Sequence, residues 1–431
     1  MSAATTARTA GPAAATGSRR AWLTAWLLFG FMLVNFADKT VLGLCADPIM
    51  RDLHLTRQQF GTASAAFFAL FSVSALLVSL LTRRVRSSLL LAVLAVLWSA
   101  AQIPVAAGAG FGALIGTRLL LGAAEGPAAP VAIHHLHGWF PHQRRALPTA
   151  LLLSGAAGGV ALAAPVVTAV MDSWGWRWAF GLVGAAGLVW SALWLRLGRE
   201  GPPAPDAGPA LPPDAAGRVP YRRILLSGTV LSAAFGAFAA YWMLSANLTW
   251  MPDYLHDVMG FSTRRTALVT AGVGLVTGLL LLGHGRLTGR EASPTARRRL
   301  PEGVPVGLLV CTAGACVAGF ALSGSTALRM VLLLGPMALA TLVLTASQLA
   351  CARICPPGQR GPVLGAVACV YGLGGVLSPV VTGHLVDAAP TLAAGYRQAF
   401  LATAVLVAVA GVLVCVFLRP ERDGRRLGSL H

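Results

Sequence analysis

Four charged residues lie inside apolar stretches of this sequence, where an ionised side chain needs a chemical reason to be present. Asp38 and Lys39 share one stretch, and Arg118 and Glu125 share another. Lys39 is the only lysine in the 431 residues. A charge at the centre of a bilayer costs about 2.5–3.5 kcal/mol on insertion scales, and such residues usually face an aqueous cavity and handle a substrate or a proton. The alternative is a structural ion pair that holds two helices together.

The residue types suit anion binding next to proton transfer. Arginine offers a carboxylate a planar fork of donors and stays protonated. A carboxylate in a low-dielectric cavity beside a cation can be tuned to take up and release a proton. We therefore expect Lys39 and Arg118 to bind an anionic substrate group, and Asp38 and Glu125 to couple protons, with Glu125 as the main proton site. A static bond between Arg118 and Glu125 is the alternative.

Helix geometry relates the depths of these residues in the membrane. Arg118 and Glu125 are seven residues apart, so a helix returns them to nearly the same face about 10.5 Å apart along its axis. If the first stretch ends near Ala46 at the outer boundary, Lys39 lies roughly 10 Å below it. Arg118 lies roughly 9 Å below the same boundary if its stretch begins near Gly112. We expect the two cations to converge on one anionic group, with Glu125 deeper.

The elements that position these residues are transmembrane helices. The sequence is 56% hydrophobic and only 11% charged, whereas a soluble domain has about 25% charged residues. Apolar runs near 20 residues recur along the whole length, which predicts an all-α integral membrane protein. We expect twelve spans, at residues 22–45, 60–81, 88–108, 112–135, 149–170, 178–197, 224–247, 265–285, 304–323, 327–350, 362–383 and 398–418.

The basic residues are distributed asymmetrically between the two sides of these spans. Of the 33 cations, 24 fall on the side of the N-terminus, 7 on the opposite side and two inside spans. Cytosolic loops carry such an excess, so both termini are expected in the cytosol. The net charge of +18 is therefore explained by membrane topology, and we expect a lipid bilayer and no nucleic acid as partner.

A proline-rich interval at residues 199–223 divides the spans six and six. Proline density of this kind disfavours helix and indicates an extended linker. Two six-helix halves around a central linker are the layout of major facilitator transporters, whose sites lie at mid-membrane between the halves. The expected organisation is a tail at 1–21, a first half at 22–198, the linker, a second half at 224–418 and a tail at 419–431.

The second half has no charged residue clearly inside a span, so its expected contribution is neutral. Tyr241, Asn247, Gln348 and Tyr371 are the predicted substrate contacts there, because a cavity needs neutral donors and stacking faces for the remainder of a substrate. The seven cysteines show neither metal-ligand spacing nor a disulfide framework. We expect no metal, no cofactor and no enzymatic nucleophile–base pair.

Several segments resemble the anion:cation symporter family of the major facilitator superfamily. Asn-Phe-Ala-Asp-Lys-Thr at 35–40 is similar to the family's Asn-Tyr-x-Asp-Arg segment, with lysine in place of the usual arginine. Arg-Leu-Leu-Leu-Gly-Ala-Ala-Glu-Gly-Pro at 118–127 is close to the family's signature. Further similar segments lie at 138–141, 144–146, 175–180, 250–255, 356–361 and 372–375. The loop at 79–86 departs from the superfamily's Gly-x-Leu-x-Asp-Arg-x-Gly motif, because its aspartate and both glycines are missing.

The resemblance implies a carrier of organic anions such as sugar acids, dicarboxylates or aromatic acids, and bacterial members are mostly proton symporters. It assigns Asp38 and Glu125 to proton coupling, and Lys39 and Arg118 to the substrate carboxylate. Precedent in the superfamily also implies a monomer. The composition, rich in arginine, alanine and glycine, indicates a bacterial source, and we expect the protein in the plasma membrane. The expected function is proton-coupled import of a small organic anion. A proton-coupled exporter of an acidic metabolite and a membrane sensor that does not transport are the alternatives.

Overall fold

The computed structural model describes residues 12–81, 84–108, 110–141, 144–201, 219–291, 303–356 and 359–428. In these residues the regular structure is helical, and no strand is assigned. Among the described residues, ten helical stretches are long and apolar enough to cross a membrane, and one of them, Thr326–Ile354, comprises three consecutive helical elements. The predicted all-α membrane class is confirmed. Residues 82 and 83 of the unusual loop, most of the predicted linker and the ends of both predicted tails lie outside the described residues.

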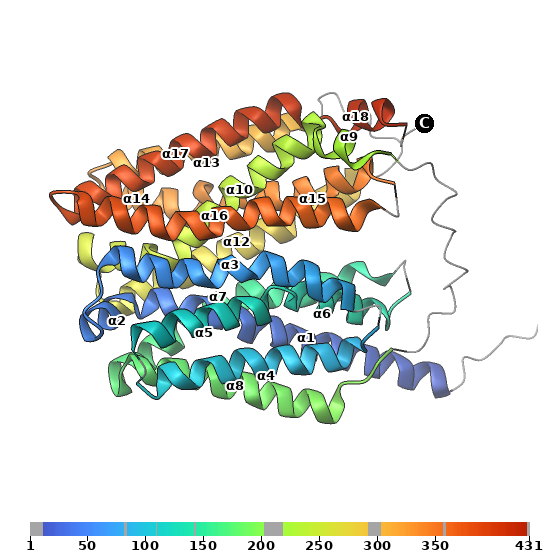
Figure 1. The fold of residues 1–431 in the computed structure, drawn as a ribbon, viewed down its shortest axis with the longest axis horizontal. Helices are drawn as coiled ribbons and strands as arrows, with labels where there is room; N and C mark the ends of the chain where they lie inside the picture. The colour runs from blue at the N-terminus through green and yellow to red at the C-terminus, as the bar shows by residue number, and fades with distance from the viewer. Residues whose placement is uncertain are drawn as a thin grey trace, which may run out of the picture.

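The helices before the linker form one bundle, which Figure 1 shows in blue to green. They run nearly parallel to one another along the long axis of the molecule. Their bounds are α1 Pro12–Leu44, α2 Ala46–Asp52, α3 Arg57–Leu81, α4 Ser87–Ala106, α5 Phe111–Glu125, α6 Ala128–His137, α7 Ala146–Trp174 and α8 Trp176–Leu197.

The helices after the linker form the second bundle, in yellow-green to red (Figure 1). The two bundles meet where α3 packs on α16 and α7 packs on α12. The bounds are α9 Tyr221–Leu225, α10 Gly228–Thr249, α11 Met251–Asp253, η2 Tyr254–Val258, α12 Thr263–Glu291, α13 Gly303–Leu322, α14 Thr326–Leu334, η3 Pro336–Thr341, α15 Leu342–Ile354, α16 Arg360–Ala388, α17 Leu392–Phe417 and α18 Pro420–Arg426.

Two predicted spans are broken where the sequence has Gly-Pro. The span expected at 112–135 is divided into α5 and α6 at Gly126–Pro127. The span expected at 327–350 is divided into α14, the 3-10 turn η3 and α15, with the break at Gly335–Pro336. Proline removes a backbone donor and its ring clashes with the carbonyl four residues earlier, so it interrupts a helix. The break after Glu125 places this carboxylate at the end of α5.

Two glycines let two pairs of helices near the site approach each other closely at the backbone. A Cβ on Gly43 of α1 would lie 1.8 Å from the Leu248 carbonyl oxygen of α10. A Cβ on Gly122 of α5 would lie 1.8 Å from the Phe67 carbonyl oxygen of α3. Small residues at such crossings allow close packing inside membranes. The first crossing joins the two halves, and the second sets α5 against α3 one turn before Glu125.

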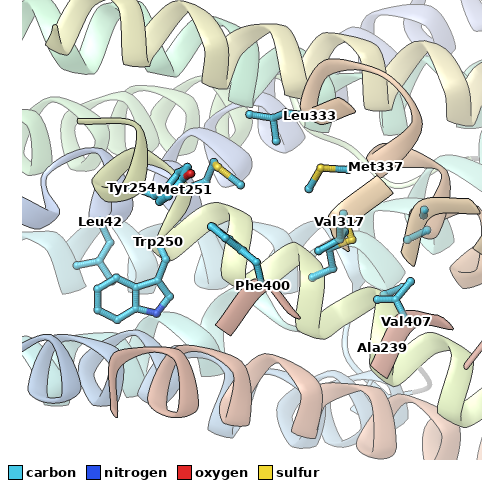
Figure 2. Close-up of a cluster of buried hydrophobic side chains, with 14 of the residues drawn as sticks. Leu42, Ala239, Trp250, Met251, Tyr254, Val317, Leu333, Met337, Phe400 and Val407 are labelled. Carbon is cyan, nitrogen blue, oxygen red and sulfur yellow. The ribbon is translucent and has the colours of Figure 1, made fainter. Parts of the chain in front are cut away.

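An apolar core crosses between the halves at the end of the bundles that carries α2 and η2, here called the α2 end. Figure 2 shows Leu42 of the first half in the same cluster as Trp250, Tyr254 and Phe400 of the second. The Trp250 indole donates to the Pro379 carbonyl at 3.1 Å. At this end the two halves therefore pack against each other through buried side chains.

The opposite end, where the linker leaves α8, is called the linker end. Glu200, just after α8, accepts hydrogen bonds from the Ser88 amide at 2.8 Å and from the Ser87 hydroxyl at 2.9 Å. Burial raises the pKa of Glu200, but these hydrogen bonds outweigh it and leave the pKa below its usual range. The carboxylate thus fastens the start of the linker to the first turn of α4.

Candidate functional site

The four charged residues predicted from the sequence come together between α1, α4 and α5. Asp38, Arg118 and Glu125 are at most 2% exposed, and the Lys39 side chain is 7% exposed. Isolated charges at this burial would be very unfavourable, so each of them needs a partner. The structure provides these partners in two pairs, and the Asp38 and Glu125 carboxyl groups also lie within hydrogen-bonding range of each other, so the four residues form one cluster.

The first pair joins Lys39 to Glu125. The Lys39 ammonium lies 2.5 Å from Glu125 Oε2 and donates to Asn35 Oδ1 at 2.5 Å. Asn35 is one helical turn before Lys39, so both lie on the same face of α1. An ammonium has three donors, and these two bonds leave the third for another acceptor.

Aromatic rings surround the same ammonium. It lies 4.6 Å from the ring centroid of Phe36, 5.6 Å from that of Phe71 and 5.7 Å from that of Phe67. Ring faces attract a cation electrostatically, and they also exclude water. The pair of Lys39 and Glu125 is therefore held in apolar surroundings, where the attraction between opposite charges is strong.

The second pair joins Asp38 to Arg118 through an amide. The Gln102 side chain of α4 donates to Asp38 Oδ1 and accepts from Arg118 Nη2 at 3.2 Å. The Arg118 guanidinium also lies 5.2 Å from the ring centroid of Phe180 in α8. Gln102 is not among the predicted site residues. It could have been found, because a single amide within the apolar stretch 88–108 indicates a buried hydrogen-bond partner.

The pairing differs from the sequence-based expectation. Arg118 and Glu125 share a helix, but two turns separate them by roughly 10.5 Å along its axis. Glu125 binds Lys39 of the neighbouring helix instead. The two cations engage different acceptors, whereas the expectation was that both would converge on one anionic group. Their convergence on a substrate stays a prediction.

Four buried atoms of this cluster have no hydrogen-bond partner within the structure. They are Asn35 Nδ2, Asp38 Oδ2, Arg118 Nε and Glu125 Oε1. A buried polar group left unpaired costs about 1–3 kcal/mol. Two of these atoms are donors and two are acceptors, so the cluster keeps hydrogen-bonding capacity for anionic oxygens, protons or water.

An aromatic wall connects this cluster to the second half. The ring centroid of Phe71 lies 6.3 Å from that of Tyr241, and the Tyr241 and Tyr371 centroids lie 4.7 Å apart. Both tyrosines were predicted as substrate contacts; Tyr241 of α10 lies next to Phe71, and Tyr371 of α16 lies next to Tyr241. Gln348 is exposed on α15 and Asn247 is half-buried on α10, and the roles of both stay predictions.

A second charged cluster joins the halves at the α2 end. Arg57 of α3 lies 3.2 Å from Asp253 and 2.6 Å from Asp257. The Tyr396 hydroxyl of α17 also donates to Asp253. Burial raises the pKa of Asp253, and the neighbouring Arg57 opposes this effect. We call Arg57, Asp253, Asp257 and Tyr396 the clasp; none of them is among the predicted site residues.

Further polar contacts accompany the clasp. Asp387 of α16 accepts from the backbone amide of Gln58 at 2.7 Å, and Ser64 and Thr249 share a hydrogen bond of 2.7 Å. A cavity of about 260 Å³ beside the clasp is lined in part by Gly43 and Asp253. These contacts join α3 of the first half to α10 and α16 of the second, and the cavity does not include the four charged residues.

Within the described residues, no group of three side chains of ligand type could hold a metal ion.

Comparison with known proteins gives consistent matches over most of the chain. The family model described as Major Facilitator Superfamily matches residues 27–340 and 292–429. The chain is 28% identical to a hexuronate transporter of Bacillus subtilis, covering 91% of this chain and 94% of that protein. It is 27% identical to a probable sulfoacetate transporter of Cupriavidus necator, covering 90% and 91%. It is 25% identical to a D-galactonate transporter of Escherichia coli, covering 86% and 90%.

Two solved structures share the fold. A bacterial homolog of the human lysosomal transporter Spinster, crystallised in an inward-facing and unoccupied conformation, has a TM-score of 0.78 at 19% identity and covers 95% of this chain and 98% of its own. A D-xylose–proton symporter has a TM-score of 0.74 at 14% identity, covering 93% and 98%. At these identities the likeness shows the arrangement of helices.

Proposed function

We propose, from the premise that this chain belongs to the Major Facilitator Superfamily, that it imports a small organic anion together with protons. Family and relatives are transporters and not enzymes. The relatives named for hexuronate and D-galactonate support a carboxylate as the cargo. The observation that carries the proposal is the buried pair of Lys39 and Glu125, 2.5 Å apart and surrounded by aromatic rings.

The proposed mechanism is an exchange of partners at Lys39. When Glu125 takes up a proton, its charge is lost and the Lys39 ammonium is left without an anion. A buried ammonium without a counter-ion is unfavourable, so the site then favours the carboxylate of a substrate. Release of the substrate restores the pair and expels the proton. Proton and anion therefore strengthen each other's binding, as thermodynamic linkage requires.

Asp38 of α1 and Arg118 of α5 take part in this exchange as a second proton acceptor and a second hydrogen-bond donor to the anion. Arg118 Nε has no partner and is a further donor for the bound anion. Asp38 is the second carboxylate that a proton can reach through its unpartnered oxygen. We propose that the body of the substrate contacts Tyr241 and Tyr371, since their rings lead from the cluster into the second half.

The charge distribution supports an orientation with both termini in the cytosol of a bacterial cell. The linker end is then cytosolic and the α2 end faces outward, in the plasma membrane. The four charged residues come from α1 and α5 of one chain, so we propose that a monomer suffices. In this orientation the clasp closes the outer side, and the halves must separate there to admit a substrate.

Uptake into proteoliposomes tests this function. A labelled panel of organic acids is offered with and without an inward proton gradient. A gradient of one pH unit supplies about 1.4 kcal/mol per proton, so a carrier that moves one proton per anion is expected to accumulate its substrate about tenfold. Absence of accumulation for every acid contradicts symport. If preloaded acid leaves faster when protons can enter, the exporter alternative holds.

Removal of the clasp arginine is expected to open the outer side. Arg57→Ala leaves Asp253 and Asp257 without their cation, and a shift of only 1.4 kcal/mol between closed and open states changes their ratio about tenfold. Cys45 is buried between α1 and α2, two residues from the Gly43 crossing. With the other six cysteines changed to serine, alkylation of Cys45 by an impermeant maleimide is expected to be at least about tenfold faster in Arg57→Ala.

Arg51→Ala is the matched control for that experiment. Arg51 also lies at the α2 end and pairs with Asp47 at 2.9 Å, but its side chain is 74% exposed and its partner belongs to the same helix. Exposed pairs of this kind contribute little to stability, so labelling of Cys45 is expected to stay at the wild-type rate. Equal labelling rates in the two variants would argue against the clasp as the outer gate.

A further inference from the structure

The cavity beside the clasp lies between the two halves of the chain and is separate from the four charged residues. Its volume is about 260 Å³. The first half contributes the end of α1, the start of α2 and the last turns of α7, and the second half contributes α11, η2 and the first turn of α12. Pockets for drug-sized ligands measure about 300–1,000 Å³, so this volume suits a smaller ligand of a few carbon atoms.

The lining of this cavity is acidic. Asp47 of α2, Asp172 of α7 and Asp253 of α11 line it, and no lysine or arginine is among the described residues that do so. Asp172 is exposed, and the Asp47 side chain is 23% exposed and pairs with Arg51 at 2.9 Å. These two carboxylates lie toward the solvent, whereas Asp253 is buried. A cleft lined by one sign of charge attracts ions of the opposite sign, so the lining favours a cation.

The basic side chains around the cavity leave this acidity uncompensated. Arg57 faces two carboxylates at once, Asp253 at 3.2 Å and Asp257 at 2.6 Å. His256 lines the cavity, and its Nδ1 lies 2.9 Å from Asp257 Oδ1, a hydrogen bond that a neutral imidazole can donate. The two arginines at 264–265 are exposed and do not line the cavity. The clasp therefore has one carboxylate more than it has arginines.

Two buried oxygen atoms of the lining have no hydrogen-bond partner among the described residues. They are Asp253 Oδ1 and Thr266 Oγ1, in side chains that belong to residues 2% and 5% exposed. The other Asp253 oxygen, Oδ2, accepts from Arg57 and Tyr396. Oδ1 thus remains available to a further donor. A buried acceptor without a donor is unfavourable, and an ammonium group has three N–H donors that can serve both oxygens.

We propose that this cavity binds a small primary ammonium compound and that the bound compound holds the two halves together at the α2 end. The ammonium group donates to Asp253 Oδ1 and Thr266 Oγ1, and the carboxylates of Asp47 and Asp172 attract it from solution. Both halves form the walls, so separation of the halves removes part of the contacts. A ligand shifts an equilibrium through its different affinity for the two states. The compound therefore favours the closed state of the α2 end and slows its opening.

Calorimetric titration of the purified protein in detergent tests the binding and requires no transport. The probe is 1,4-diaminobutane, and 1,4-butanediol, of the same length but without charge, is its control at equal ionic strength. The diamine is expected to bind at least about tenfold more tightly than the diol. Equal binding of the two compounds, or no binding of the diamine, would overturn the proposal.

Two variants locate the bound diamine. Thr266→Val keeps the shape of the side chain and removes its hydroxyl, so the dissociation constant is expected to rise about tenfold, as for the loss of a hydrogen bond to a charged group. Asp172→Asn removes a charge at an exposed position and is expected to raise the dissociation constant about threefold. If Thr266→Val does not fold, Asp172→Asn decides. A wild-type constant in a folded variant of either kind contradicts the assignment to this cavity.

Asp52→Asn is the matched control for these variants. Asp52 is a carboxylate of the same α2 helix, but it pairs with Arg177 and does not line the cavity. Its loss changes the net charge of the α2 end by the same amount as Asp172→Asn. The dissociation constant of the diamine is expected to stay within about twofold of the wild type. A rise equal to that in Asp172→Asn would show a general charge effect and would overturn the site.

Exchange of an accepted organic acid across proteoliposomes at equal pH tests the effect on opening, and this part rests on the proposed function. Diamine added outside is expected to lower the exchange rate by about half or more, and the diol is expected to have no effect. The inhibition is expected to persist at saturating acid, because the compound binds the state that is closed at the α2 end. Relief by excess acid would show competition at the central cluster and overturn the proposal. If no acid is transported at all, the proposed function fails, and the titration still decides the binding site.

Discussion

Glu125→Gln is expected to abolish accumulation driven by a proton gradient while leaving exchange of substrate across the membrane largely intact. Glutamine has the shape of protonated glutamate but cannot release a proton. Lys39 then stays without its anionic partner, 2.5 Å away in the wild type, and remains available to the substrate. Accumulation under one pH unit, about tenfold for a single coupled proton, is expected to fall to none.

Two measurements distinguish a loss of proton coupling from a loss of folding or of transport in general. Exchange of labelled for unlabelled substrate at equal pH is expected to continue in Glu125→Gln at a rate within a few-fold of the wild type. Glu200→Gln is the control, because Glu200 lies outside the spans, where it binds the start of α4 and lies 3.6 Å from His135 of α6, away from the four charged residues. It is expected to accumulate substrate normally. Uphill uptake retained in Glu125→Gln would exclude this carboxylate as the coupling site.

Arg118→Leu is expected to destabilise the protein and to abolish transport. Asp38 is fully buried, and its compensating cation reaches it through Gln102. Removal of one member of a buried ionic pair typically costs about 3–5 kcal/mol, because it leaves the other charge uncompensated. Thermal unfolding in detergent is expected to show a large loss of stability.

A double variant identifies the cause of that loss. Asp38→Asn removes the stranded charge, so Asp38→Asn combined with Arg118→Leu is expected to regain most of the stability that Arg118→Leu loses. The interaction energy follows from the double-mutant cycle, which isolates coupling between neighbouring residues. If the double variant is no more stable than Arg118→Leu, then the contact between Asp38 and Arg118 through Gln102 does not stabilise the protein. Transport is expected to stay impaired in both.

The broken helices show how far the chain could be predicted locally. The expected spans near 112–135 and 327–350 are present, but each is divided at a Gly-Pro pair. The two breaks could have been predicted from the prolines, because the loss of a backbone donor is a local property of the sequence. Hydropathy alone does not register such a break, since it sums transfer energies and ignores hydrogen-bond geometry.

The sequence predicted the charged residues of the candidate site, but it did not predict which side chains they bind. Asp38, Lys39, Arg118 and Glu125 stood out because charge is rare inside an apolar stretch. Gln102 did not, because one neutral amide has a small effect on hydropathy. The clasp was also not predicted, since Arg57 and Asp253 are loop-flanking charges in the sequence and meet only when the two halves pack together.

The sequence by itself determined the membrane class, the uneven distribution of basic residues among the polar segments and the identity of the four buried charges. Each of these depends on composition within a short segment, where free energies of transfer add residue by residue. Only the tertiary structure decided that Glu125 binds Lys39 and that Gln102 lies between Asp38 and Arg118. Pairing depends on how each helix is rotated and how closely it approaches its neighbours. Contacts such as Gly122 on Phe67 set that approach, and they join residues far apart in the chain.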